Sequence, residues 1–252
     1  MFDRIKRLRW KIINWRYAQF AVRAERPGYL VNSEYDKIQQ QLKAEGYYSQ
    51  VGQDKWIIEK LFADKVDGTF VDIGAHDGVT FSNTYLLEKK GWNGIAIEPN
   101  PLVYEKLSKN RKCITIKGCI TSKPGKGKFR MITGYPEMLS GLITEYDARH
   151  VNRIYEEINS RGGEYKDIDV DCYNLVELLK SYKMLQVDYL SMDIEGAEYE
   201  VLKSIDFDRI NIAVIGVENN YLDWRIPKLL ISKGYEFNSI VGDEFYINKK
   251  TK

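Results

Sequence analysis

The feature that most constrains the fold of this chain is an alternation of short apolar runs with helical segments, which begins at residue 69. Three runs, TFVDI (69–73), GIAIE (94–98) and CITIKG (113–118), have the length and apolar character of buried strands. Helical segments separate them, one through SNTYLLEKKG (82–91) and one from Pro101 to about Asn110. Strands joined by helices pair in parallel through right-handed crossovers. The chain is therefore predicted to form an α/β fold with a parallel sheet covered by helices.

Residues 121–170 interrupt this alternation. They begin with a Lys- and Gly-rich stretch from Lys123 to Lys128, which we expect to form a turn, followed by a short strand. A polar helical segment, EYDARHVNRIYEEINSRGG (145–163), then ends in a pair of glycines. We expect this insertion to lie over the ends of the sheet.

The alternation resumes after the insertion and ends in a hairpin signal around Gly242 and Asp243, where two β-rich runs flank a turn. The segments, in order, are a helix at 175–182, a strand at 187–193, a helix at 197–205, a strand at 210–218, a helix at 223–234 and the hairpin at 235–248. A terminal antiparallel hairpin is therefore predicted at the end of a mostly parallel sheet.

A basic amphipathic helix is predicted near the N-terminus. Ile5, Leu8, Ile12 and Trp15 recur at helical spacing within residues 2–22, with arginines and lysines beside them. Such a helix packs on its own domain, pairs with a second copy of the chain as a homodimer, or makes a peripheral contact with a membrane. The sequence leaves these three alternatives open.

A break follows this helix. The stretch RPGYLVN (26–32) is expected to be a linker, because Pro27 and Gly28 interrupt the helical pattern. We therefore divide the chain into an N-terminal helix and linker (1–46) and one larger domain (47–252) that carries the insertion.

The composition excludes several classes of protein. The 38 basic and 36 acidic residues give a net charge of +2, so no overall field favours nucleic acid. The three cysteines lack CxxC or metal-finger spacing, which argues against a disulfide framework or a zinc site. The apolar runs are too short to span a membrane, and the charged N-terminus lacks the apolar core of a signal peptide. We therefore expect a soluble, cytoplasmic protein.

The loop after the first strand, in FVDIGAHDGVTFSNT (70–84), carries the first chemical signal. Ligands of an open parallel sheet bind beyond the carboxyl ends of its strands. A dinucleotide site requires GxGxxG, whose second glycine lets the backbone approach a pyrophosphate. This loop has Gly74 and Gly78 alone, with His76 at the second position. The sequence therefore argues against a nicotinamide dinucleotide.

The same loop suits a ligand that combines an amino acid with a nucleoside. Asp72 can meet an ammonium group, and the backbone amides near Gly74 and Ala75 can approach the amino-acid end. Glu98, at the end of the second strand, is placed to accept hydrogen bonds from two ribose hydroxyls. The loop alone also fits an ordinary strand-to-helix turn. Together with Glu98, it indicates S-adenosylmethionine.

Five motifs in order carry a resemblance to a known family. They are YSQVGQDKWI (48–57), FVDIGAHDGVTFSNTYLLEK (70–89), GIAIEPNP (94–101), DYLSMDIEGAEYEVLKSI (188–205) and GDEFYI (242–247). Together they resemble the FkbM family of S-adenosylmethionine-dependent methyltransferases over about residues 47–248. The resemblance implies a class I methyltransferase fold, which is Rossmann-like: a mostly parallel seven-stranded sheet whose last strand inserts antiparallel.

The resemblance also implies a set of cofactor-binding residues around these motifs. The family commonly has Asn at the position of His76, so this chain departs from the pattern there. The upstream motif, which contains Gln50, is expected to close over the methionine end of the cofactor. The expected cofactor residues are Gln50, Asp72, Gly74, Ala75, His76, Gly78, Ser82, Asn83, Thr84, Glu98, Pro99, Asn100 and Cys119.

Three acids follow the fourth and fifth strands of the alternation and are the catalytic candidates: Asp193, Glu195 and Glu218. Methyl transfer to a hydroxyl requires in-line alignment and removal of the hydroxyl proton. Asp193 or Glu195 can act directly as the base. Alternatively, all three hold a divalent metal such as Mg²⁺ or Mn²⁺ that acidifies the hydroxyl. A third interpretation is that they cap the following helix or contact the cofactor.

The insertion supplies the candidates for acceptor binding: Ser140, Tyr146, His150 and Arg153. The two histidines, His76 and His150, are weaker candidates for the base, since a lone histidine is more often structural. The 18 tyrosines and 5 tryptophans are compatible with stacking on sugar rings and equally with an ordinary core.

The resulting hypothesis is an O-methyltransferase. The resemblance implies a sugar hydroxyl of a glycan or glycoconjugate as acceptor, with another small-molecule hydroxyl as the alternative. A nucleic-acid methyltransferase is disfavoured, because Asp-Ile-Glu-Gly stands where amino-methylating enzymes place an Asn/Asp-Pro-Pro-aromatic loop. A nicotinamide-dependent dehydrogenase and a cofactor-binding module without catalysis are the rivals from other classes.

Overall fold

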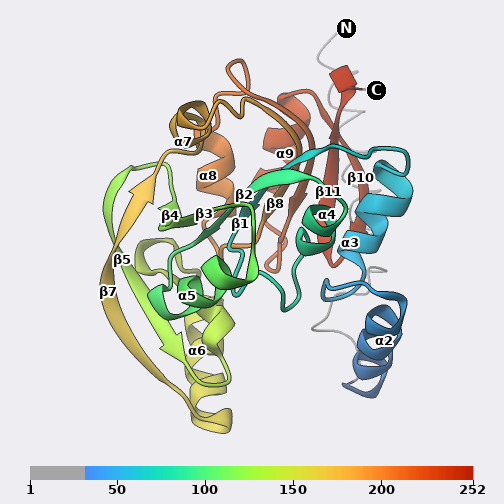
Figure 1. The fold of residues 1–252 in the computed structure, drawn as a ribbon. Coiled ribbons are helices and arrows are strands. Elements are labelled where there is room, and N and C mark those ends of the chain that lie inside the picture. Colours follow the sequence, from blue (N-terminus) through green and yellow to red (C-terminus); the bar gives the residue numbers. More distant parts are fainter. Residues whose placement is uncertain (1–31, 252) are drawn as a thin grey trace, which may run out of the picture.

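The computed structural model describes residues 32–251 and forms an α/β fold (Figure 1). Its central sheet has seven strands in the order β10-β11-β9-β8-β1-β2-β3. The helix expected at 2–22 and most of the linker expected at 26–32 lie outside the described residues. Helix α2 (Asn32–Glu45) begins at the last residue of the expected linker and continues almost to the start of the larger domain expected at residue 47.

The sheet is parallel except at its C-terminal hairpin, as predicted. Its parallel strands are β1 (Thr69–Ile73), β2 (Asn93–Glu98), β3 (Ile114–Lys117), β8 (Gln186–Met192) and β9 (Asn211–Val217). The last strand, β11 (Asp243–Asn248), inserts antiparallel between β9 and β10 (Tyr235–Val241). The chain runs outward from β1 to β2 and β3, and later from β8 to β9. The switch point of the topology therefore lies between β1 and β8.

Both faces of the sheet are buried, which explains why its strands are apolar almost throughout. One face packs against helices α7 (Leu175–Ser181), α8 (Glu198–Ser204) and α9 (Arg225–Ser232) through a large aliphatic core. The other face carries Phe70, Tyr189 and Phe245, which pack against Leu87 and Ile57. Adjacent strand residues point to opposite faces, so Phe70 and Val71 enter different cores.

Short helices connect the strands on the second face. They are α3 (Gln53–Trp56), continued by a π-helix over Ile57–Leu61, then α4 (Tyr85–Lys89) and α5 (Pro101–Asn110). Helix α5 begins at the predicted proline because the side chain of Asn100 accepts a hydrogen bond from the Leu102 amide and Pro101 occupies the first helical position. This cap fixes the chain just beyond the end of β2, where Glu98 lies.

The insertion forms a second, four-stranded sheet beside the first (Figure 1). Its strands are β4 (Cys119–Ile120), β5 (Gly125–Thr133), β6 (Gly141–Leu142) and β7 (Glu164–Tyr173). A 3₁₀ helix (Glu137–Leu139) and a second one (Ile143–Glu145) flank β6, and α6 (Ala148–Arg161) follows. The polar helix was predicted correctly, whereas the long strand β7 was not predicted.

The expected turn from Lys123 to Lys128 is wrong in part, because Gly125–Lys128 belong to β5. The charged side chains there pair directly across the ladder with β7, as in Lys126–Asp171 and Lys128–Asp169. The opposite face of the ribbon buries Phe129 against Val170 and Cys172. Opposite charges on facing positions stabilise such a pair of strands.

None of the helices in the described part of the chain combines the length and the apolar character needed to cross a bilayer.

Candidate functional site

Three connected chambers open at the carboxyl ends of the central strands. The β2 chamber is lined by Glu98, Cys119, Leu142 and Asp193, among others. The β1 chamber is lined by Asp72, Ala75, Ser82, Asn83 and Ser191, and shares Gly74, His76 and Asp193 with the β2 chamber. The β9 chamber is lined by Tyr146, Tyr199, Glu218, Tyr221 and Trp224. Glu195 belongs to both the β2 and the β9 chambers.

Glu98 ends β2 with its side chain buried in the β2 chamber. One carboxylate oxygen accepts from the His76 amide at 3.0 Å, and the other accepts from the Asn100 amide at 2.8 Å. Burial nevertheless raises the pKa of Glu98 to about 7, against the effect of these amides. Each oxygen keeps a further lone pair, so the carboxylate remains able to accept hydrogen bonds from a ligand.

The loop after β1 crosses closely over the loop after β8. A Cβ atom on Gly74 would lie 1.8 Å from the backbone oxygen of Asp193, and Gly74 has a φ of 87°, so only glycine fits here. The amides of Gly74 and Ala75 both donate to the Ile97 carbonyl at 3.0 Å. The expectation that these amides approach the ligand is therefore wrong. Both residues line the β1 chamber, but their N–H groups anchor the loop to β2.

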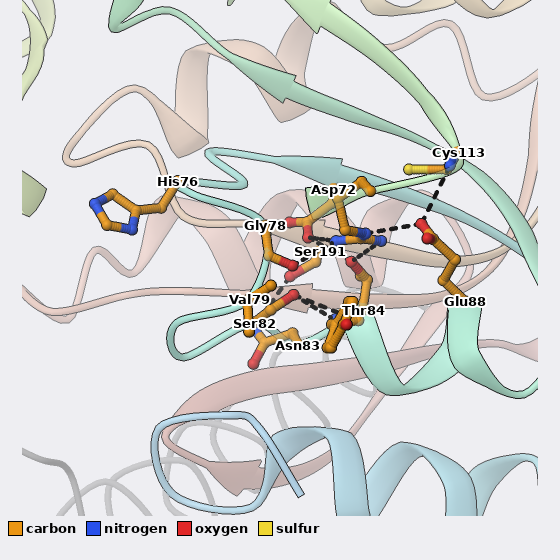
Figure 2. A network of polar contacts seen from close by, with 12 residues as sticks. Asp72, His76, Gly78, Val79, Ser82, Asn83, Thr84, Glu88, Cys113 and Ser191 are labelled. Atoms are coloured by element: carbon orange, nitrogen blue, oxygen red, sulfur yellow. Dashed lines mark hydrogen bonds and ion pairs between the residues drawn. The ribbon is translucent and has the colours of Figure 1, made fainter. Parts of the chain in front are cut away.

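Asp72 belongs to a buried polar network behind the β1 chamber (Figure 2). Its Oδ2 accepts from the Thr84 hydroxyl at 2.5 Å and lies 4.0 Å from the Arg111 guanidinium. Arg111 also donates to Thr84 and to Glu88, at 3.1 and 2.8 Å. Protein groups thus engage Oδ2 of Asp72, which also lines the β1 chamber, and its role toward an ammonium group stays a prediction. Arg111, which sequence reasoning missed, ties the β1 loop to α4.

Asn83 places polar atoms directly in the β1 chamber. Its amide nitrogen donates to Ser191 at 3.1 Å and to Asp243 at 3.0 Å. Its oxygen is buried and has no hydrogen-bond partner among the described residues. Ser82 instead accepts from the amides of Thr84 and Tyr85, so it caps α4. The unpaired oxygen of Asn83 marks a position for a donor on a ligand.

His76 faces the insertion and points away from the Asp72 network (Figure 2). Its φ of 49° lies in the left-handed region, and its Nε2 lies 3.1 Å from a carboxylate oxygen of Glu137. Burial opposes charging of the ring, but Asp77, Glu98 and Glu137 outweigh it and raise the pKa of His76. His76 thus joins the β1 loop to the insertion across the β2 chamber.

The three catalytic candidates converge where the chambers meet. Asp193 and Glu218 follow β8 and β9, and their carboxylate oxygens lie within 4.8 Å of each other. Enclosure by protein and the charge of Glu218 raise the pKa of Asp193, although part of Asp193 is exposed to the chambers. Burial and Asp193 likewise raise the pKa of Glu195 well above its ordinary value. This strong perturbation is typical of a group that exchanges protons in a reaction.

The metal-binding trio expected at this point is not assembled as predicted. The acids whose ligand atoms lie within 4.8 Å of one another are Asp193, Glu198 and Glu218, so Glu198 takes the place of Glu195. Glu195 has a φ of 56°, which turns it toward the insertion. Glu198 already accepts from the amides of Ile194 and Gly196. Glu198 therefore holds the loop before α8, and the cluster by itself does not define a metal site.

The candidates for acceptor binding separate into two pairs. Tyr146 and His150 lie beside Glu195, and Tyr146 lines the β9 chamber. Ser140 instead lines the β2 chamber and closes a turn by donating to the Glu137 carbonyl. Arg153 is exposed and pairs with Glu157 one helical turn away. Of these four candidates, the structure thus places Tyr146 alone in the lining of the β9 chamber.

Some of the remaining expected cofactor residues line a chamber, and the others do not. Pro99, Asn100 and Cys119 line the β2 chamber. Among the described residues, Gln50, Gly78 and Thr84 line none of the three chambers. A Cβ atom on Gly78 would lie 2.6 Å from side-chain atoms of Leu107 and Arg111, so this glycine allows packing against α5.

Aromatic and arginine side chains at the mouth of the β9 chamber were missed. The Arg149 guanidinium lies 4.5 Å from the centre of the Tyr221 ring, and that of Arg225 lies 4.1 Å from the Tyr199 ring. Trp224 is 44% exposed there. The run NNYLDWR, directly after the strand that carries Glu218, was the signal that could have found them.

The family of this chain follows from comparison with known proteins. A model of the Methyltransferase FkbM domain matches residues 72–240, more than half of the chain. The chain belongs to the FkbM methyltransferase family. The β2 and β9 chambers of this FkbM protein meet at Glu195.

Two named relatives agree with this assignment. The chain is 29% identical to Methyltransferase sdnD of Sordaria araneosa over 194 residues, which is 66% of this chain and 73% of that protein. It is 27% identical to Methyltransferase 1 of Beauveria bassiana (strain ARSEF 2860) over 208 residues, 77% of this chain and 82% of the relative. A TehB-like SAM-dependent methyltransferase from Corynebacterium glutamicum superposes with a TM-score of 0.40 at 12% identity, covering 85% of this chain and 94% of its own.

Proposed function

We propose that this FkbM protein transfers a methyl group from S-adenosylmethionine to a hydroxyl oxygen of an acceptor in the β9 chamber. The observation that carries the proposal is the position of Glu195, which lines both the β2 and the β9 chambers. A base at this boundary can reach an acceptor hydroxyl that faces the cofactor.

The residues of the chambers fit the cofactor. The buried carboxylate of Glu98 would accept from the ribose hydroxyls, and the apolar side chains of Val103 and Leu142 in the β2 chamber would enclose the base. The unpaired oxygen of Asn83 in the β1 chamber would accept from the ammonium group, the role that the sequence suggested for Asp72. His76 and Glu137 close the chamber from the insertion side.

The chemistry requires little of the protein beyond alignment and proton removal. When bound, S-adenosylmethionine supplies a methyl group that its sulfonium makes electrophilic. As the acceptor oxygen bonds to the methyl carbon and the carbon–sulfur bond breaks, the hydroxyl proton passes to a carboxylate of this chain. Glu195 is the base in this proposal, because it lines both chambers. A direct base of this kind needs no metal.

A sugar hydroxyl of a glycan or glycoconjugate is the acceptor class that we propose. The walls of the β9 chamber combine aromatic rings, from Tyr199, Tyr221 and Trp224, with the amide group of Asn220. Aromatic faces stack on the apolar faces of sugars, and amides satisfy their hydroxyls. Another small molecule that carries a hydroxyl remains the second candidate for the same chamber.

The proposal is tested by methyl transfer from radiolabelled S-adenosylmethionine to a panel of sugars, glycans, hydroxylated small molecules, RNA and DNA. We expect labelled product from a sugar-containing acceptor, with an alkali-stable ether linkage. Glu195→Gln should lower turnover by about 100-fold or more while S-adenosylhomocysteine still binds. Glu156→Gln, an exposed acid on α6, is the matched control and should retain full activity. Labelling of nucleic acid alone, or cofactor binding without any turnover, would overturn the proposal.

A further inference from the structure

His150 is fully buried, although it comes from the insertion and lies next to the β9 chamber. Its Nε2 lies 3.1 Å from the backbone carbonyl of Leu139. A carbonyl oxygen can only accept, so Nε2 carries a proton. The ring of Tyr146 packs against the imidazole with centroids 4.8 Å apart, and its hydroxyl donates to the same Leu139 carbonyl at 3.2 Å. The orientation of the ring is therefore fixed on the insertion side.

The other ring nitrogen faces the central domain. Nδ1 lies 3.3 Å from Oε2 of Glu195 and 3.4 Å from the hydroxyl of Tyr221. These two residues come from the loops after β8 and β9, so three separate parts of the chain meet at this atom. The Tyr221 hydroxyl can donate to an unprotonated Nδ1, whereas the ionised Glu195 carboxylate can be held only by a proton on Nδ1. One hydrogen bond therefore has to form here.

The two oxygens of the Glu195 carboxyl have different surroundings. Oε2 is buried and has no hydrogen-bond partner among the described residues, and it lies 3.3 Å from Nδ1 of His150. The left-handed backbone at Glu195 directs the side chain to this place, at a cost that a surface loop would not normally carry. Strain of this kind persists where the surrounding structure holds a group in one position.

We propose that His150 is a positioning residue for Glu195: when the carboxyl is ionised to act as the base, a proton on Nδ1 holds Oε2, so that the other oxygen faces the acceptor hydroxyl. This inference rests on the proposed function, in which Glu195 is the base. It gives the insertion a role in the reaction. Helix α6 carries His150, and the 3₁₀ helix before β6 carries Leu139, whose carbonyl fixes the imidazole ring that orients the carboxyl. Tyr221 then limits the space on the far side of the contact.

The first test uses the fact that the chain has two histidines. The full chain is labelled with ¹⁵N-histidine, and long-range ¹H–¹⁵N spectra report the tautomer and hydrogen bonding of each ring nitrogen. His76→Asn assigns the signals by removing one set. We expect a protonated Nε2 in His150, and an Nδ1 resonance that shifts more in Glu195→Ala than in Tyr221→Phe. An unprotonated Nε2, or an Nδ1 signal that follows Tyr221 and ignores Glu195, would overturn the inference.

The second test measures turnover with the acceptor found in the panel above. His150→Phe should lower kcat by about 10- to 100-fold with the KM for S-adenosylmethionine unchanged, because a catalytic group is then misplaced. His150→Asn should recover part of the loss, since its amide can occupy the position of Nδ1. Equal activity of His150→Phe and the wild type would contradict the inference.

Titration with S-adenosylhomocysteine separates this inference from the proposed function. If the wild type binds it and the Nδ1 signal ignores Glu195, the role of His150 alone is wrong. If the wild type does not bind it, the proposed function fails, whatever the spectra show. Retained binding in His150→Phe also shows that this variant is folded.

Discussion

Glu98→Gln is the substitution whose effect follows most directly from the structure. The carboxyl is buried at the end of β2, and burial raises its pKa from the ordinary value of 4.5 to about 7. The folded protein therefore holds a proton at Glu98 that the unfolded chain releases between pH 4.5 and 7. The stability contributed by the protonated form is fully present below pH 4.5 and is lost as the pH rises through 7. Glutamine does not titrate, so its contribution is the same at every pH.

The magnitude follows from the two pKa values. At about 1.4 kcal/mol per pH unit, the interval from 4.5 to about 7 amounts to about 3 kcal/mol, of which about 2 to 3 kcal/mol falls between pH 5 and pH 8. The absolute stability of the variant also changes, because an amide nitrogen then faces a backbone N–H of His76 or Asn100. That contribution is the same at every pH, so it does not affect how the difference in the free energy of unfolding between the two proteins changes with pH.

The assay is urea unfolding of the ligand-free wild type and Glu98→Gln at pH 5, 6, 7 and 8. We expect the free energy of unfolding of the wild type, minus that of the variant, to fall by about 2 to 3 kcal/mol over this range. The same comparison in a His76→Asn background removes the neighbouring imidazole and isolates the carboxyl. A difference that stays constant with pH, or rises, would refute the reasoning.

Two further substitutions test how the β1 loop is held, each by urea unfolding. Arg111→Met should lower the free energy of unfolding by about 3 to 5 kcal/mol, because it leaves Glu88 without its cation in a buried pair. Lys128→Met removes the cation of an exposed pair, so this control should have little effect. Equal losses of stability in the two variants would contradict this account. Gly74→Ala should cost at least about 2 kcal/mol, because its Cβ would overlap the Asp193 carbonyl at a positive φ. A Gly74→Ala protein of wild-type stability would show that the two loops are not packed as described.

The central sheet was predictable from the sequence because local signals there agree with the tertiary structure. Apolar runs form its buried strands, and the Asn100-Pro101 pair starts α5 where the sequence indicated. The terminal hairpin around Gly242 pairs as expected. The insertion was harder to predict. In β7 the apolar residues alternate with aspartates, and the strand is stable because lysines of β5 lie opposite them, which no local pattern records.

The site was predictable in its location and less so in its hydrogen bonds. Glu98 and the acids after β8 and β9 meet at the carboxyl ends of the strands because the topology brings those ends together. Which groups remain free for a ligand depends on contacts between distant segments. The amides of Gly74 and Ala75 are taken by Ile97, and this is visible only once β1 and β2 are placed side by side.

Glu198, and not Glu195 as predicted, lies in the acidic cluster with Asp193 and Glu218. This difference also arises from contacts that the sequence does not reveal. The spacing of the acids after β8 does not reveal the positive φ at Glu195, which directs its side chain toward His150 and leaves Glu198 beside Asp193. A backbone conformation that strains a residue other than glycine is set by tertiary structure, and sequence preference argues against it.

The central claim is that the β1 and β2 chambers bind S-adenosylmethionine, and calorimetric titration with S-adenosylhomocysteine tests it most directly. We expect a Kd in the micromolar range for the wild type, weakened by about 10- to 100-fold in Glu98→Ala through the loss of charge-assisted hydrogen bonds, with no binding of NAD. Glu105→Ala, an exposed acid on the nearby α5, should bind as the wild type does. Failure of the wild type to bind S-adenosylhomocysteine, or equal affinity in Glu98→Ala, would contradict the account.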